Sequence, residues 1–151
     1  MRAHKQIVAI ASTGGHWHQL GKITEGLGDL PIIYISTQAG LCPPHPNAQV
    51  LLVPDCNRNE PMRVLACTAR MIWMWPRLRP ALVISTGALP GLVGIAIARL
   101  FGVQTLWIDS VANADVLSAS GKLARRIAHT TVSQWEHVAA QEGVGFQGRI
   151  L

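Results

Sequence analysis

Small hydroxyl and glycine residues gather at two places where an apolar run of the sequence ends. The first group consists of Ser12, Thr13, Gly14 and Gly15. The second consists of Ser85, Thr86 and Gly87. In such turns, backbone N–H groups and the start of a following helix can bind a phosphate or pyrophosphate. Both groups are therefore candidate binding sites for an anionic substrate, although tight turns and ordinary helix N-caps use the same residues.

Two ionisable side chains adjoin turns of this kind. His16 follows the first group, and a neutral imidazole can accept a proton from an attacking hydroxyl or donate a hydrogen bond to phosphate. Asp109 and Ser110 end a later apolar run, and the Asp109 carboxylate could orient or deprotonate an acceptor hydroxyl. A histidine bonded to backbone and an aspartate bonded to its own loop are the alternatives. His16 and Asp109 are thus the catalytic candidates, and Ser110 is a further binding candidate.

Five arginines lie within 22 residues that contain a single acidic residue, Glu60. They are Arg58, Arg63, Arg70, Arg77 and Arg79. The planar guanidinium group suits bidentate contact with phosphate better than an ammonium group does. This segment therefore indicates a partner that bears phosphate, whether nucleic acid, anionic lipid or a pyrophosphate substrate.

Three of these arginines recur every seven residues and so share one stripe of a helix. They are Arg63, Arg70 and Arg77. We expect Leu65 and Ile72 on the opposite side of this helix, facing the sheet, and Trp73 and Met74 beside the arginine stripe. Arginines bordered by apolar side chains favour a helix that lies on an anionic membrane surface. A solvated basic face with a partly exposed tryptophan is the alternative.

The elements that must position these residues follow from the apolar runs and from the glycines and prolines between them. Strands are predicted at residues 6–11, 31–36, 50–54, 81–85, 103–109 and 130–134. Helices are predicted at residues 17–27, 62–75, 90–101, 117–128 and 135–142. This alternation predicts right-handed βαβ units and an α/β fold, a Rossmann-like parallel sheet with helices on both faces. Ligands of such sheets bind beyond the carboxyl ends of the strands, where the candidate residues stand.

Length and composition narrow the function classes. The 151 residues, of which 49% are hydrophobic and 14% charged, predict one folded domain over residues 1–151 with a net charge of +5. Two nucleotide-binding domains would need roughly 300 residues. The five tryptophans fall on different predicted elements, so they form no stacking platform for nucleic acid. The glycine turn lacks the G-x-G-x-x-G pattern and no acidic residue ends the second strand, so we expect no nicotinamide or other cofactor.

Cysteine usage and hydropathy bear on the compartment. The three cysteines, Cys42, Cys56 and Cys67, include no C-x-x-C pair, so neither a disulfide framework nor a metal site is predicted, and a reducing cytosol fits best. The longest apolar stretch, residues 88–106, contains proline, glycine and arginine, which argues against a membrane-spanning helix.

Six segments, in order along the chain, carry a resemblance to a known family. They are ASTGGHWHQL (11–20), VPDCNR (53–58), VISTGA (83–88), WIDS (107–110), LSASGKL (117–123) and SQW (133–135). With these motifs the chain resembles bacterial exopolysaccharide glycosyltransferase subunits, described as UDP-N-acetylglucosamine to lipopolysaccharide N-acetylglucosamine transferases. It is also similar to the membrane-anchoring subunit of the eukaryotic enzyme that adds the second N-acetylglucosamine to dolichyl-pyrophosphate-GlcNAc.

This resemblance implies the amino-terminal, acceptor-side half of a GT-B glycosyltransferase, with the UDP-sugar site on a separate partner chain. The reaction it implies is inverting transfer from a UDP-sugar, UDP-GlcNAc or a related hexose donor, to a polyprenyl-linked saccharide. Related enzymes that glycosylate lipid-linked muramyl acceptors carry a similar Gly-Gly-His turn, so the acceptor pyrophosphate is expected on Gly14, Gly15 and His16. We expect the chain to be inactive without its donor-binding partner.

The resemblance also bears on location. The eukaryotic subunit has an amino-terminal membrane helix, whereas this sequence starts almost directly on its first predicted strand. We therefore expect a cytoplasmic protein attached peripherally to the anionic inner face of the cytoplasmic membrane. The eukaryotic subunit tends to have Glu in place of Asp109 and an acidic residue in place of Gln19. The alternative function is a non-catalytic scaffold that docks on the membrane and recruits the donor-binding catalytic partner.

Overall fold

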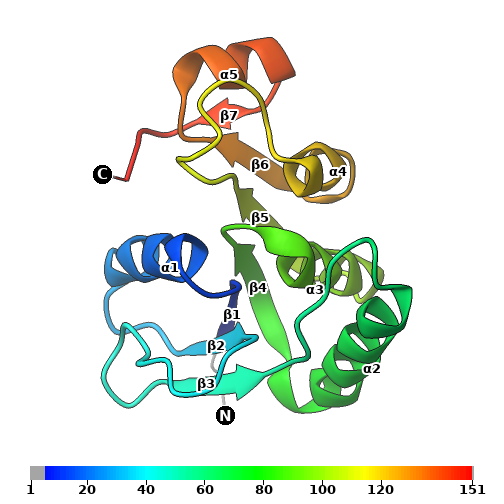
Figure 1. Ribbon diagram of the computed structural model, residues 1–151. Coiled ribbons are helices and arrows are strands. Elements are labelled where there is room, and N and C mark those ends of the chain that lie inside the picture. The colour runs from blue at the N-terminus through cyan, green and yellow to red at the C-terminus, as the bar shows by residue number, and fades with distance from the viewer. Residues whose placement is uncertain (1–5, 151) are drawn as a thin grey trace.

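A seven-stranded sheet forms the centre of the protein, for which a computed structural model describes residues 6–150 (Figure 1). Its strands are β1 (Gln6–Ile10), β2 (Ile32–Ser36), β3 (Gln49–Leu52), β4 (Pro80–Ser85), β5 (Gln104–Ile108), β6 (Thr130–Ser133) and β7 (Gly145–Phe146). They lie in the order β3-β2-β1-β4-β5-β6-β7, and all neighbouring pairs are parallel. From β1 the chain moves toward β2, and from β4 it moves the other way toward β5, so the strand order reverses between β1 and β4.

Helices connect the strands and cover the sheet. They are α1 (Gly15–Glu25), α2 (Pro61–Leu78), α3 (Ala88–Leu100), α4 (Ala119–Ile127) and α5 (Glu136–Glu142). Helix α1 packs on one face of the sheet, and α2, α3 and α4 pack on the other (Figure 1). Side chains of β1 point alternately to the two faces of the sheet and so contribute to both hydrophobic cores. Ile7 and Ala9 pack in the core between the sheet and α1, whereas Val8 and Ile10 pack in the core between the sheet and α2 and α3.

The observed architecture confirms the predicted Rossmann-like α/β fold, and all six predicted strands and five predicted helices are present. Strand β7 was not predicted, because two residues are too few to show a periodic pattern. Helix α1 begins at Gly15, two residues before its predicted start, so His16 lies in its first turn. Helix α2 continues to Leu78, three residues beyond its predicted end, although Pro76 stands in its last turn and cannot donate a backbone hydrogen bond to the carbonyl oxygen of Ile72.

The outer face of α2 differs from the sequence expectation. Met74, predicted to flank the arginine stripe, is only 4% exposed and belongs to the core with Cys67 and Met71. Leu65 and Ile72, expected to face the sheet, are instead 61% and 47% exposed. The seven-residue spacing shows which residues share a stripe of the helix. It could not show which stripe faces the sheet, because α2 carries apolar side chains on both sides.

Two of the three cysteines are enclosed between the loop after β3 and α2. Cys56 and Cys67 are 5% and 0% exposed, and both are free thiols. Burial raises the pKa of the Cys56 thiol and raises the pKa of Cys67 to about 12, so both thiols stay protonated at neutral pH. Cys42 is exposed.

We expect only Cys42 to react quickly in the folded protein, because a reactive thiol must be accessible and partly ionised. At about pH 8, Ellman's reagent should titrate one thiol per native chain and all three after unfolding in urea. Cys42→Ser should remove the fast reaction. Three fast thiols in the native protein would contradict the enclosed placement of Cys56 and Cys67.

Candidate functional site

The loops after β1 and β4 meet at the carboxyl edge of the sheet, where the strand order reverses. Gly14 adopts a φ of +67° as the N-cap of α1 and offers no side chain to the first N–H groups of the helix. Gly14 and Gly15 are exposed, and Ser12 and Thr13 are half-buried. This open helix start is compatible with the anion binding that the sequence predicts, which stays a prediction.

His16 is held by the loop after β4. Its Nδ1 lies 3.0 Å from the carbonyl oxygen of Thr86, and Thr86 Oγ1 donates a hydrogen bond of 2.7 Å to the carbonyl oxygen of His16. Because a carbonyl oxygen only accepts, Nδ1 carries the proton, and in the neutral ring the lone pair lies on Nε2. Within residues 6–150, Nε2 has no hydrogen-bond partner. A half-buried imidazole oriented in this way can serve as a general base.

Gly87 makes room for the His16 ring. It adopts a φ of +143°, and a Cβ atom on this residue would overlap ring atoms of His16. The next residue, Ala88, adopts a φ of +64°, a conformation that costs a residue with a side chain on the order of 1–3 kcal/mol. The loop between β4 and α3 is therefore shaped around the histidine.

Ser85 and Thr86, predicted to contact a substrate, are both fully buried. Ser85 Oγ accepts the N–H of Gly87 at 3.3 Å and lies where a side chain on Gly91 would stand, so α3 packs directly on it. The Thr86 hydroxyl is bonded to the backbone of His16. These two hydroxyls therefore hold the loop and the histidine in place of the predicted contact with a ligand.

Asp109 turns inward at the end of β5 and is 1% exposed. Its carboxylate accepts four hydrogen bonds of 2.6–3.1 Å, from Trp107 Nε1, Asn113 Nδ2 and both the N–H and the hydroxyl of Ser118. Ser118 in turn caps α4 by accepting the N–H of Gly121 at 2.8 Å. A carboxylate enclosed and occupied in this way is not placed to take a proton from a substrate. The geometry therefore replaces the predicted catalytic role with a structural one, the attachment of the β5 loop to α4.

Sequence reasoning missed a buried polar network that joins α1 to the loops after β5 and β6. Gln19 donates to Ser110 Oγ at 3.0 Å, and its Oε1 accepts from Val111 N at 3.1 Å and from Gln134 Nε2 at 2.7 Å. Gln134 also donates to the carbonyl oxygen of Asp109 at 3.0 Å. Ser110, a predicted binding residue, is 6% exposed and belongs to this network. The available signal was the position of both glutamines inside segments that carry the family resemblance.

Several solved structures contain the same fold. MurG from Acinetobacter baumannii matches 86% of this chain with a TM-score of 0.69 at 18% identity. A UDP-N-acetylglucosamine 2-epimerase from Rickettsia bellii matches 95% with a TM-score of 0.69 at 14% identity, and a glycosyltransferase from Rickettsia africae matches 96% with 0.65 at 12%. At these identities the likeness shows the fold alone, a Rossmann-like domain of the kind that forms half of a GT-B enzyme.

The chain spans 41%, 43% and 41% of the lengths of these three structures. No family model matches the sequence, and no curated protein matches it. Helices in the described part of the chain are too short or too polar to cross a membrane. Among residues 6–150, no three His, Cys, Asp or Glu side chains are grouped so that they could hold a metal ion.

Asp109→Asn should destabilise the protein, because an amide has only one acceptor oxygen. Its NH₂ group would face two donors in either orientation: Trp107 Nε1 and the Ser118 hydroxyl at Oδ1, or Asn113 Nδ2 and the Ser118 N–H at Oδ2. The free energy of unfolding should fall by about 1–3 kcal/mol. Urea unfolding followed by circular dichroism measures this change. Asp115→Asn, at an exposed position, is the matched control and should stay within about 0.5 kcal/mol of wild type. An Asp109→Asn variant as stable as wild type would remove the structural role of this carboxylate.

Proposed function

We propose that this chain is the acceptor-binding half of a GT-B glycosyltransferase. It would transfer a sugar from UDP-GlcNAc or a related donor to a polyprenyl-linked saccharide, and a separate donor-binding chain would supply the opposite half. The observation that carries the proposal is the geometry of His16, whose Nδ1–H is fixed by Thr86 and whose Nε2 is left as an acceptor beside the glycine turn. The motif resemblance and the likeness in fold to MurG support the reaction class.

In the proposed reaction, His16 Nε2 takes the proton of the acceptor hydroxyl as the hydroxyl oxygen attacks the anomeric carbon of the UDP-sugar. The new glycosidic bond forms while the bond from that carbon to the UDP oxygen breaks, so UDP leaves and the configuration inverts. The first N–H groups of α1, after Gly14, would stabilise negative charge that approaches the reacting centre, because the helix dipole favours negative charge there.

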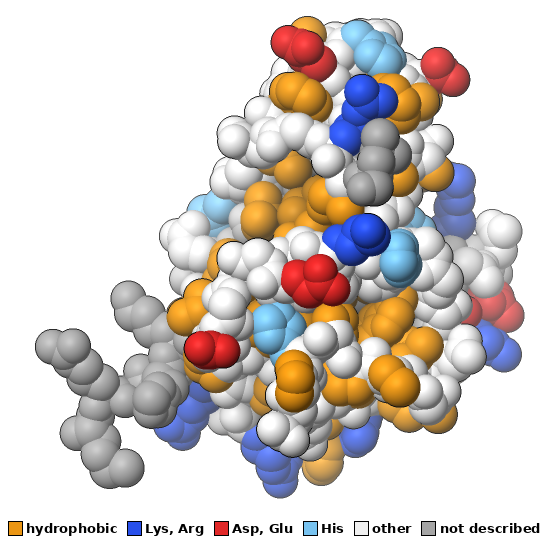
Figure 2. Space-filling model, turned by 90° about the vertical axis from the view of Figure 1, so that its left-hand side faces the viewer, with side chains coloured by type: hydrophobic (Ala, Val, Ile, Leu, Met, Phe, Trp, Pro, Cys, Tyr) orange, Lys and Arg blue, Asp and Glu red, His pale blue; other side chains and the backbone are white. Residues whose placement is uncertain are grey.

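The exposed side of α2 supports attachment to the anionic inner face of the cytoplasmic membrane. The guanidinium groups of Arg70 and Arg77 each lie 4.7 Å from the ring centre of Trp73, which is 58% exposed. Leu65 and Ile72 add exposed apolar surface on the same helix. On the α1 side, by contrast, acidic, basic and histidine side chains are interspersed with apolar ones (Figure 2). An indole at headgroup depth with arginines on anionic lipid is a stable interfacial arrangement.

Sugar transfer should require both halves and His16. The purified chain should transfer no labelled sugar from UDP-GlcNAc to a polyprenyl-pyrophosphate-linked acceptor until the donor-binding chain is added. In that complex, His16→Ala should lower kcat by about 10²- to 10⁴-fold, the usual cost of losing a general base. His18→Ala, exposed two residues further along α1, is the matched control and should keep wild-type turnover.

Two outcomes of this assay would count against the proposal. Robust turnover by the chain alone would contradict the need for a second half. Full turnover by His16→Ala, with binding of the donor chain intact, would leave only the non-catalytic scaffold that docks on the membrane and recruits its partner.

Trp73→Gln and Arg70→Glu should each weaken sedimentation with vesicles of phosphatidylglycerol and phosphatidylcholine by about fivefold or more. The first removes the indole that would enter the headgroup region, and the second removes a basic residue that contributes about 1 kcal/mol at such a surface. The effect of Arg70→Glu should shrink in about 0.5 M salt, because salt screens the attraction. Leu30→Gln and Lys22→Glu are matched changes at exposed positions outside α2. If these controls bind vesicles as weakly as the α2 variants do, α2 is not the docking surface.

A further inference from the structure

A cavity of about 640 Å³ opens where α3 and α4 begin, beside the loop after β3. Ala88 and Leu89, the first residues of α3, line one side, and Ala119 and Ser120, the first residues of α4, line another. The N-termini of two helices therefore border one space. The first N–H groups and the dipole of α3 favour an anion in it, whereas the first turn of α4 already faces Ser118 and the Asp109 carboxylate.

Basic side chains line this cavity, and its wall includes no Asp or Glu from the described part of the chain. They are Arg58, Lys122, Arg125 and Arg126. Arg125 is compensated, because its Nη1 lies 2.8 Å from the carboxylate of Glu142. The other three form no ion pair within residues 6–150. Arg58 comes from the loop after β3, and Lys122 and Arg126 come from the first and last turns of α4. Uncompensated cations that line one cavity suit a phosphate group.

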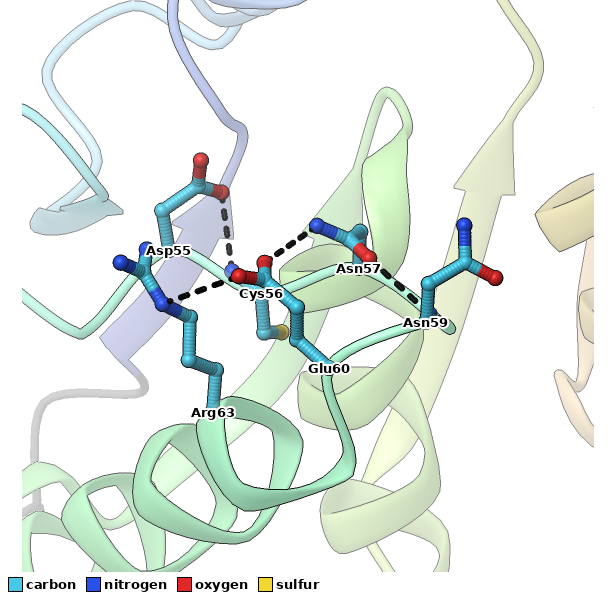
Figure 3. Close-up of polar contacts among 6 residues, drawn as sticks. All are labelled: Asp55, Cys56, Asn57, Asn59, Glu60 and Arg63. Atoms are coloured by element: carbon cyan, nitrogen blue, oxygen red, sulfur yellow. Dashed lines mark hydrogen bonds and ion pairs between the residues drawn. The ribbon is translucent and has the colours of Figure 1, made fainter.

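The acidic residues nearest to Arg58 in the sequence are engaged elsewhere, as Figure 3 shows. Asp55 accepts the backbone N–H of the next residue at 3.0 Å. Glu60 accepts a hydrogen bond from the amide of Asn57 and pairs with Arg63 at 3.4 Å. These contacts give the loop a defined shape and leave the charge of Arg58 available to a ligand.

An apolar groove of about 320 Å³ continues from the cavity along α3 and α4. Leu89, Leu123 and Arg126 line both spaces, so the cavity and the groove adjoin. The remaining lining residues are apolar: Leu92, Val93, Ala96 and Ile127. The outward positions of α3 are thus apolar on a helix that reaches the protein surface, and a furrow between two packed helices suits a single hydrocarbon chain.

We propose that this groove and cavity bind the lipid end of the acceptor, with one isoprenoid chain in the groove and its phosphate on Arg58, Lys122 and Arg126. The inference rests on the proposed function and places the lipid-proximal phosphate away from the glycine turn. The β4–α3 loop connects the two regions, because Ala88 lines the cavity while Gly87 contacts the His16 ring. The saccharide then extends past this loop toward Nε2.

Farnesyl diphosphate, a short isoprenoid probe, tests this subsite on the intact chain without donor or partner. Calorimetry should show tighter binding of farnesyl diphosphate than of inorganic pyrophosphate, because only the former fills the groove. Arg126→Ala and Lys122→Ala should each weaken the binding of farnesyl diphosphate by about 10-fold or more, as expected for the loss of a charged hydrogen bond. Lys22→Ala, on α1, is the matched control and should bind as wild type does.

Ala96→Trp tests the groove independently of the cations. Ala96 is half-buried at the surface of α3, so an indole can occupy the groove without entering the core. This variant should bind farnesyl diphosphate about 10-fold or more weakly and inorganic pyrophosphate unchanged. Its circular dichroism spectrum should match that of wild type.

Three results would overturn the subsite. Equal affinity for farnesyl diphosphate and pyrophosphate would mean that no chain enters the groove. Binding lost in His16→Ala but kept in Arg126→Ala would place the phosphate at the glycine turn. If Ala96→Trp no longer binds phosphatidylglycerol vesicles but still binds farnesyl diphosphate as wild type does, the groove binds bilayer lipid and not the isoprenoid chain. Failure of the glycosyltransferase proposal is distinguishable, because it appears as absent turnover in the two-chain complex while farnesyl diphosphate still binds as described.

Discussion

The imidazole of His16 and the backbone of Gly87 occupy adjoining space, and the geometry of the candidate site depends on this contact. No side chain fits at residue 87, because its Cβ would overlap the ring. Thr86 holds the histidine twice, through its carbonyl oxygen on Nδ1 and its hydroxyl on the His16 carbonyl. These bonds join the loops after β1 and β4, whose helices α1 and α3 lie on opposite faces of the sheet. These hydrogen bonds therefore hold together the two loops at the point where the strand order reverses, and they leave His16 Nε2 available to accept a proton.

Polar groups at the strand ends are of two kinds: some are buried and hydrogen-bonded within the protein, and others are accessible to a ligand. Asp109, Ser85 and Gln19 are buried, and each forms hydrogen bonds within the protein, because an unpaired polar group in the interior is costly. Their role is to hold α3, α4 and the β5 loop in position. The groups that remain for a ligand at the end of β1 are the half-buried Ser12 and Thr13, the N–H groups of the first turn of α1 and the imidazole of His16. The chemistry available is therefore narrower than the number of polar residues in the motifs suggests.

The side of the sheet covered by α2, α3 and α4 presents both basic and apolar side chains at the protein surface. Helices α2, α3 and α4 lie on the same side of the sheet (Figure 1). Trp73 with its arginines is exposed on α2, and the apolar groove is lined by residues of α3 and α4. In the proposed arrangement, a membrane bound by α2 presents a lipid-linked acceptor to this groove, and the saccharide reaches the strand ends where His16 stands. One orientation of the protein then serves membrane attachment, lipid binding and proton transfer.

The sequence by itself determined strands β1 to β6, helices α1 to α5 and the parallel Rossmann-like sheet, because side-chain periodicity and turn residues act locally and crossover connections have one hand. It also placed His16 at the edge of the sheet. It did not show the two-residue strand β7. Only the tertiary structure decided that Asp109 faces inward, that Met74 is buried while Leu65 is exposed, and that Arg58 and Arg126 line one cavity. The physical reason is that these outcomes depend on what each side chain meets across the fold, and residues far apart in sequence meet only after the strands have paired.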